Sequence, residues 1–173
     1  MSIFDTSLAI RGNENKQQML EWVKTDPSHF TQLMTLVLGP DLKIADQASR
    51  IMPECVIPNP TLFVPYIGDV LNRLQAPKLT DSLRLNITRA LQYVSIPEEH
   101  QGLAADILFG YLANPDIPVA PRCFGMSVLA NICADIPELA AELRLIIEEQ
   151  IPHSSPAFRT RAKQVMKQLN RRK

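Results

Sequence analysis

The chain has 173 residues, of which 46% are hydrophobic, so it is long enough and apolar enough to bury a core. Its 18 Lys and Arg residues balance its 18 Asp and Glu residues, which argues against a generally basic nucleic-acid-binding protein. The chain has only 6 Gly but 14 Pro, a composition that disfavours Gly-rich phosphate loops.

The chain has neither a membrane-spanning segment nor a disulfide framework in its sequence. No apolar run approaches the roughly 18 residues that a transmembrane helix requires, and the first residues contain no run typical of a secretory signal. The three cysteines Cys55, Cys123 and Cys133 are odd in number and widely spaced. We therefore expect a cytoplasmic protein without a membrane partner, whose cysteines pack as small apolar side chains; the alternative is a nucleophile or a metal ligand.

Prolines separate a series of segments whose apolar residues recur at helical spacing. Because Pro is tolerated in the first turn of a helix and excluded from its interior, this spacing predicts where helices start and stop. We expect a capping helix at about 14–25 that carries Trp22. Four helix pairs follow, at about 27–57, 60–96, 97–136 and 137–171, with first helices at roughly 27–38, 60–75, 97–113 and 137–149.

The second helices of the four pairs superpose column by column. They begin near Ile44, Leu83, Ala120 and Ala157, and their shared columns are separated by steps of 39, 38 and 37 residues. The columns are Ala48, Ile87, Gly125, Ala162; Met52, Leu91, Leu129, Met166; Cys55, Val94, Ile132, Leu169; and Ile51, Ala90, Val128, Val165. They lie within one apolar stripe about 100° wide, so the period predicts a stack of helix–turn–helix units.

These units resemble HEAT repeats. The first helix of a HEAT repeat contains an internal proline, as in the segment Leu62–Ile67, and the second bears an Arg followed three residues later by a small residue. Arg84, Arg122 and Arg159 occupy that Arg position, whereas the first repeat has Ala45. The segment from Ser155 to Lys167 is also similar to the S-x-A-[FY]-x-x-R-A-[KR]-x-V-[ML]-K pattern of small bacterial HEAT-like proteins.

The resemblance implies an all-α fold, a right-handed α-α superhelix (solenoid) of about four HEAT-like helix pairs plus the N-terminal capping helix, in a single domain spanning 1–173. It also implies that Arg84, Arg122 and Arg159 form an inter-repeat ladder, each bonding the turn or helix end of a neighbouring repeat. The alternative for these three arginines is a row of phosphate contacts.

In a solenoid of this kind the second helices line the concave face, which is the expected binding surface. Two columns of these helices point away from the apolar stripe: Arg50, Arg89, Ser127, Gln164 and Pro53, Gln92, Ala130, Lys167. The mixture is polar without a consistent sign, which suits a protein or peptide better than a nucleic-acid groove. We predict a partner-binding site formed by Arg50, Arg89, Gln92, Gln164 and Lys167.

Positive charge gathers at the end of the sequence. Residues 156–173 contain seven Lys and Arg residues and no acid, so residues 1–155 carry a net charge of −7. Such a cluster suits a helix C-terminus and the polar outer face of a terminal helix. The alternative is a site for nucleic acid or for an acidic partner.

The chain offers little for catalysis. His29, His100 and His153 fall in different repeats, and we find no metal-ligand spacing and no motif of nucleophilic catalysis or phosphate binding. We therefore predict no catalytic residues, no cofactor and no metal. The function we predict is that of a non-enzymatic interaction module or adaptor for an unknown protein or peptide. The alternative is a nucleic-acid (DNA) binding protein that uses the basic C-terminal helix, and a third possibility is a homodimer.

Overall fold

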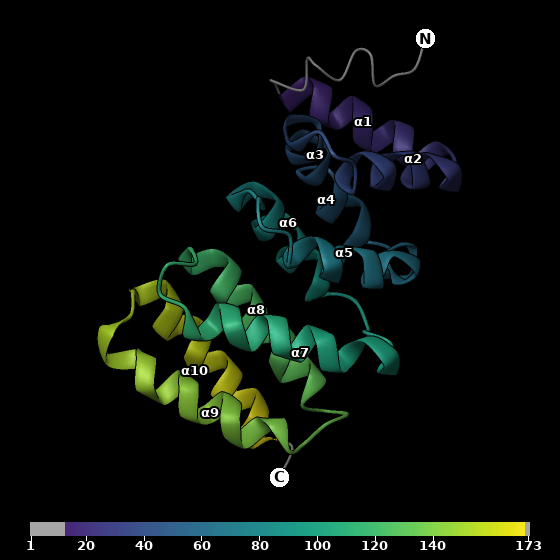
Figure 1. Cartoon of the computed structure of the whole chain (residues 1–173). Coiled ribbons are helices and arrows are strands. Elements are labelled where there is room, and N and C mark those ends of the chain that lie inside the picture. The colour runs from purple at the N-terminus through teal and green to yellow at the C-terminus, as the bar shows by residue number, and fades with distance from the viewer. Residues whose placement is uncertain (1–12, 172–173) are drawn as a thin grey trace. The chain divides into compact units, whose positions relative to one another are not determined.

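The structure is a computed structural model, and it describes residues 13–171, with side chains from Lys16 onward. Every regular element in this range is a helix (Figure 1), which confirms the all-α prediction. The chain divides into two compact units, Met1–Tyr93 and Val94–Lys173. The prediction of one uninterrupted domain stays a prediction. None of the helices within residues 13–171 combines the length and the apolar character needed to cross a membrane.

Unit 1 contains the predicted capping helix and two helix pairs. Its helices are α1 (Asn13–Thr25), α2 (Pro27–Val37), α3 (Leu42–Ser49), α4 (Met52–Val56), α5 (Ile67–Leu74) and α6 (Asp81–Leu91), with short 3-10 turns η2 (Pro60–Leu62) and η3 (Val64–Tyr66). Side chains that accept hydrogen bonds from free backbone N–H groups begin three of them: Asp26 for α2, Asp41 for α3 and Thr80 for α6.

The second helix of the first pair is broken. We predicted one helix starting near Ile44 and running through Val56, but α3 ends at Ser49 and α4 begins at Met52. The cause is Pro53, which has no N–H to donate and whose ring would clash with the carbonyl of Ser49 in a continuous helix. Proline has the same effect in the predicted helix at 60–75, where η2 and η3 replace the first turns and the α-helix is α5 alone.

The capping helix packs on the first pair of unit 1. α1 contacts α2 and α4, and α3 and α4 in turn contact α6. The indole of Trp22 in α1 stacks on the imidazole of His29 in α2, with ring centroids 3.9 Å apart and ring planes 13° apart. The Nδ1 atom of His29 lies 2.7 Å from the carbonyl oxygen of Trp22 and donates to it, since a carbonyl can only accept.

Unit 2 contains two regular helix pairs that match the predicted ranges. They are formed by α7 (Glu98–Ala113), α8 (Val119–Ile132), α9 (Leu139–Gln150) and α10 (Pro156–Asn170), with a 3-10 turn η4 (Ile151–His153) before α10. In Figure 1, α7 lies beside α8, and α9 lies beside α10. α8 also makes extensive contacts with α10, so it is covered on most of its circumference.

The repeat columns form the core of both units, as predicted. All members of the four columns are buried except Met166, which is half-buried. The small residues of the first column let the helices approach closely: a Cβ added at Gly125 would lie 3.2 Å from Cδ2 of Leu108 in α7. The sequence pattern therefore identified the buried stripe of every second helix.

Candidate interaction surface

The predicted partner-binding residues lie on or directly after second helices, namely α3 and α6 in unit 1 and α10 in unit 2. Arg50 is exposed at the end of α3, Arg89 is partly exposed in α6 and Gln92 is half-buried just after it. Gln164 and Lys167 are both exposed on α10. Their role in binding a partner stays a prediction.

An ion-pair network joins three elements of unit 1. Glu54 of α4 accepts from Arg89 of α6 at 3.1 Å and from Lys16 of α1 at 3.3 Å. Burial opposes ionisation of Glu54, but the hydrogen bond and charge of Arg89, aided by Lys16, outweigh it and hold the pKa of this carboxyl below its ordinary value. Arg89 thus has a partner within the chain, and it ties the second helices together.

Two polar contacts join the second helices of unit 2 in a similar way. Arg161 of α10 donates to Oγ of Ser127 in α8 at 2.7 Å, and its guanidinium lies 5.6 Å from the ring centre of Phe124. Gln168 of α10 donates to Oδ1 of Asn131 in α8 at 3.0 Å. We did not predict these pairs. Their only signal in the sequence is a separation of 34 and 37 residues between complementary groups, close to one repeat.

One of the two columns predicted to point outward does not do so throughout. Pro53 is buried, and Ala130 is fully buried, so the prediction is wrong for these two positions. The reason is that α4 packs against α6 and α8 packs against α10, so the following second helix covers this side. Lys167 occupies the same column in α10 and is exposed.

Arg122 connects both pairs of unit 2. Its guanidinium donates to the carbonyl oxygen of Leu112 at the end of α7, at 3.2 Å, and to Oε1 of Gln150 at the end of α9. It also lies 5.0 Å from the ring centre of Phe158 in α10, while Gln150 itself donates to Leu112 at 2.7 Å. Burial lowers the pKa of Arg122, and the guanidinium remains charged at neutral pH. These contacts are of the kind that the predicted inter-repeat ladder requires.

The other two ladder arginines have local contacts. Arg84 pairs with Asp81 at 2.6 Å, one turn earlier in α6. Arg159 donates to the carbonyl oxygen of Ser154, just before α10. An inter-repeat role for Arg84 and Arg159 stays a prediction.

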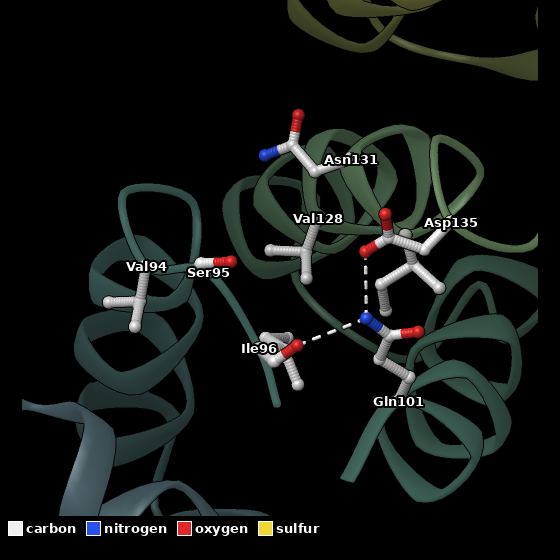
Figure 2. Close-up of a pocket in the computed structure, with 8 residues that line it drawn as sticks. Val94, Ser95, Ile96, Gln101, Val128, Asn131 and Asp135 are labelled. Carbon is white, nitrogen blue, oxygen red and sulfur yellow. Dashed lines mark hydrogen bonds between the residues drawn. The ribbon is translucent and has the colours of Figure 1, made fainter. Parts of the chain in front are cut away.

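A small cavity opens in unit 2 beside the start of α7 (Figure 2). It measures about 60 Å³ and is lined by Val94, Ser95, Ile96, Gln101, Val128, Asn131, Ile132 and Asp135. The buried Gln101 donates from Nε2 to the carbonyl oxygen of Ile96 at 3.0 Å and to Oδ2 of Asp135 at 2.8 Å. Since one water occupies about 30 Å³ of liquid, the cavity has room for about two waters and is too small for a nucleotide cofactor. Through its two hydrogen bonds, Gln101 connects the segment before α7 to the segment after α8.

The chemistry of the cysteines is that of packed side chains. All three are buried and none forms a disulfide. Burial raises the pKa of the Cys55 thiol to about 11, and burial also raises the pKa of Cys123. A thiol that stays protonated at neutral pH is a poor nucleophile and metal ligand. Within residues 13–171, no three His, Cys, Asp or Glu side chains gather into a metal-binding group.

A family model described as the HEAT repeat domain matches residues 4–169 of the chain. No curated protein and no solved structure matched the chain in the corresponding searches. The match spans both units, from the segment before α1 to the end of α10.

Proposed function

Because the chain belongs to the HEAT repeat family, we propose that it is a non-enzymatic adaptor that binds a protein or peptide on the surface of its second helices. The family match over residues 4–169 is the observation that carries the proposal, since HEAT repeats stack into scaffolds that present extended binding surfaces. The residues proposed to contact the partner are Arg50, Arg89, Gln92, Gln164 and Lys167.

The polar contacts between second helices support this assignment. Glu54 with Arg89 in unit 1, and Ser127 with Arg161 in unit 2, hold polar side chains in place before any partner arrives. A preorganised surface loses less side-chain entropy on binding than a mobile one. The exposed Gln164 lies on the same helix as Arg161 and can add hydrogen bonds to a partner.

The alternative is nucleic-acid binding through the basic C-terminal helix. It is supported by the sign of the charge on α10, which carries Arg and Lys and no Asp or Glu. Two of the seven basic residues in this part of the sequence, Arg172 and Lys173, lie outside the described residues. A homodimer is the third possibility and is tested by the mass of the protein over a range of concentrations.

The proposal is tested by placing a photo-crosslinking residue at Gln164 and, as a matched control, at Glu142. Both positions are exposed, but Glu142 lies on the first helix α9. We expect a discrete protein adduct from position 164 that survives nuclease treatment and is absent from position 142. Equal adducts from both positions, or adducts that disappear with nuclease, contradict the proposal.

A further inference from the structure

The exposed face of α10 carries a regular row of positive charges. Arg159, Lys163, Lys167 and Arg171 recur at every fourth position and are all exposed; we name them the cation stripe. Successive members rise about 6 Å along the helix axis, so the stripe extends over about 18 Å. α10 contains no Asp or Glu that would interrupt it.

The capping of a helical stack explains why this face is polar. Lys163 and Lys167 lie 37 residues after Met126 and Ala130, which are both fully buried in α8, the helix that packs against α7 and α10. In the part of the chain that the structure describes, no helix covers Lys163 and Lys167, so polar side chains are favoured at these positions. Exposure favours polar side chains at these positions, but it does not favour positive over negative charge.

The sign of the stripe needs another explanation. α1, the capping helix of unit 1, carries charges of both signs, since its Lys24 pairs with Glu21 one turn earlier in the same helix. The helix dipole favours Lys167 and Arg171 near the end of α10, but it disfavours Arg159 in the first turn. Neither the exposure of this face nor the helix dipole therefore explains why all four side chains of the row are positive.

The surroundings of the stripe favour an acidic protein segment over nucleic acid. The stripe is only one helix wide, and the adjacent α9 carries the exposed acids Glu142, Glu148 and Glu149, which repel a wide polyanion. The only aromatic residue of α10, Phe158, is 1% exposed and offers no platform for a base. A peptide with carboxylates on one face spaces them about 6–7 Å apart, both in an extended strand and at every fourth residue of a helix.

We infer that the cation stripe Arg159, Lys163, Lys167 and Arg171 binds an acidic segment of a partner protein. The inference rests on the proposed function and names the chemistry of the partner at the α10 end of the second-helix surface. Complementary charge of this kind accelerates association and selects partners by sign.

The test uses the full chain and a labelled helical peptide that carries Glu at every fourth position. A matched peptide with Gln in place of Glu is the control, and binding is measured by fluorescence anisotropy. We expect the Glu peptide to bind, the Gln peptide not to bind, and the affinity to weaken severalfold between about 50 and 200 mM salt. Equal affinity for both peptides overturns the inference.

A pair of variants with the same net charge separates the stripe from the overall charge of the protein. K163E/K167E changes the stripe, and K43E/K78E changes two exposed lysines of unit 1. We expect the stripe variant to weaken binding of the Glu peptide by about tenfold or more, because each surface charge pair contributes up to about 1 kcal/mol, and the control to change it by less than about twofold. An equal loss in both variants, or tighter binding of an oligonucleotide than of the Glu peptide, overturns the inference.

The outcome for the stripe can be separated from the outcome for the adaptor role. A protein adduct at position 164 that forms equally well in K163E/K167E overturns the stripe and the proposed contact at Lys167, and it leaves the adaptor role with the remaining contact residues standing. Binding of the Glu peptide through the stripe, without any protein adduct at position 164, supports the stripe and overturns the proposed binding surface.

Discussion

Polar pairs join the second helices in both units, but the two units bury these pairs to different extents. In unit 1 the contact between α3 and α6 includes polar pairs: Asn86 donates to Ser49 at 3.1 Å, and Thr80 donates to Asp46. In unit 2 α8 packs against α10, and Phe158 and Val165 of α10 are buried. Polar contacts in unit 2, such as Arg161 with Ser127, lie at partly exposed positions. The same repeat geometry therefore accommodates a polar pair in the core or near the surface, provided that each buried polar group finds a partner.

The difference also extends to backbone regularity. Unit 1 contains the broken helix α3–α4 and the turns η2 and η3, whereas α7, α8 and α10 of unit 2 are uninterrupted. We expect truncation of a core side chain in unit 2 to lower the free energy of unfolding more than removal of a polar pair in unit 1, because a cavity in a core costs more than a lost hydrogen bond.

The largest effect is expected from Phe158→Ala in unit 2. Phe158 is 1% exposed and fills the contact between α10 and the pair before it, so its removal leaves a cavity that costs about 3–5 kcal/mol. Urea unfolding followed by circular dichroism measures the change. Thr160→Ala, at an exposed position of the same helix, is the control and is expected to change stability by less than about 0.5 kcal/mol. A loss below about 1 kcal/mol for Phe158→Ala contradicts an apolar contact.

The next effect is expected from Gly125→Leu. The same column holds a fully buried Ile87 in unit 1, but in unit 2 the Cβ position is already 3.2 Å from Leu108, so a leucine overpacks the pair α7–α8 at a cost of about 1–3 kcal/mol. The melting temperature measures it. Gly110→Ala in α7 is the control, because no atom beyond its chain neighbours and the backbone of its own helix lies within 4 Å of its added Cβ, and it is expected to stabilise the helix by about 0.5–1 kcal/mol. An unchanged melting temperature in Gly125→Leu refutes the column assignment.

A double-mutant cycle on Asn86 and Ser49 tests the polar contact of unit 1. We expect each alanine variant to lose about 1–2 kcal/mol of stability, and the two losses to couple by about 1 kcal/mol because they share one buried hydrogen bond. Urea unfolding of the four proteins measures the coupling. Additive losses show that the hydrogen bond does not hold α3 and α6 together.

The smallest effect is expected from Glu54→Gln, and it depends on pH. Since the pKa of Glu54 is lower in the folded protein than in the unfolded chain, its ionised form stabilises the fold above the ordinary carboxyl pKa, and this contribution is lost as the pH falls through the lowered value. At pH 7 we expect the variant to be less stable by about 0.5–1 kcal/mol. Denaturation at pH 7 and at about pH 3 measures the difference, which should shrink in acid. A difference that is independent of pH contradicts the role of the Arg89–Glu54 pair.

The sequence was sufficient to predict the inward side of the second helices. Proline positions and helical periodicity predicted the helix boundaries of unit 2 and the buried columns, since both depend on local geometry and on a single face of a helix. Covered positions such as Pro53 and Ala130 were mispredicted, because their burial depends on the following repeat. Polar contacts such as Gln101 with Asp135 depend on side chains 34 residues apart, which no local pattern relates.

The stack of Trp22 on His29 gives the molecule an intrinsic optical reporter. Trp22 is the only tryptophan of the chain, and its indole lies face to face with the imidazole that joins α1 to α2. Separation of the two rings changes the immediate surroundings of the indole, on which its emission depends. Detachment of the capping helix can therefore be followed by emission from a single residue, without any label and without interference from unit 2.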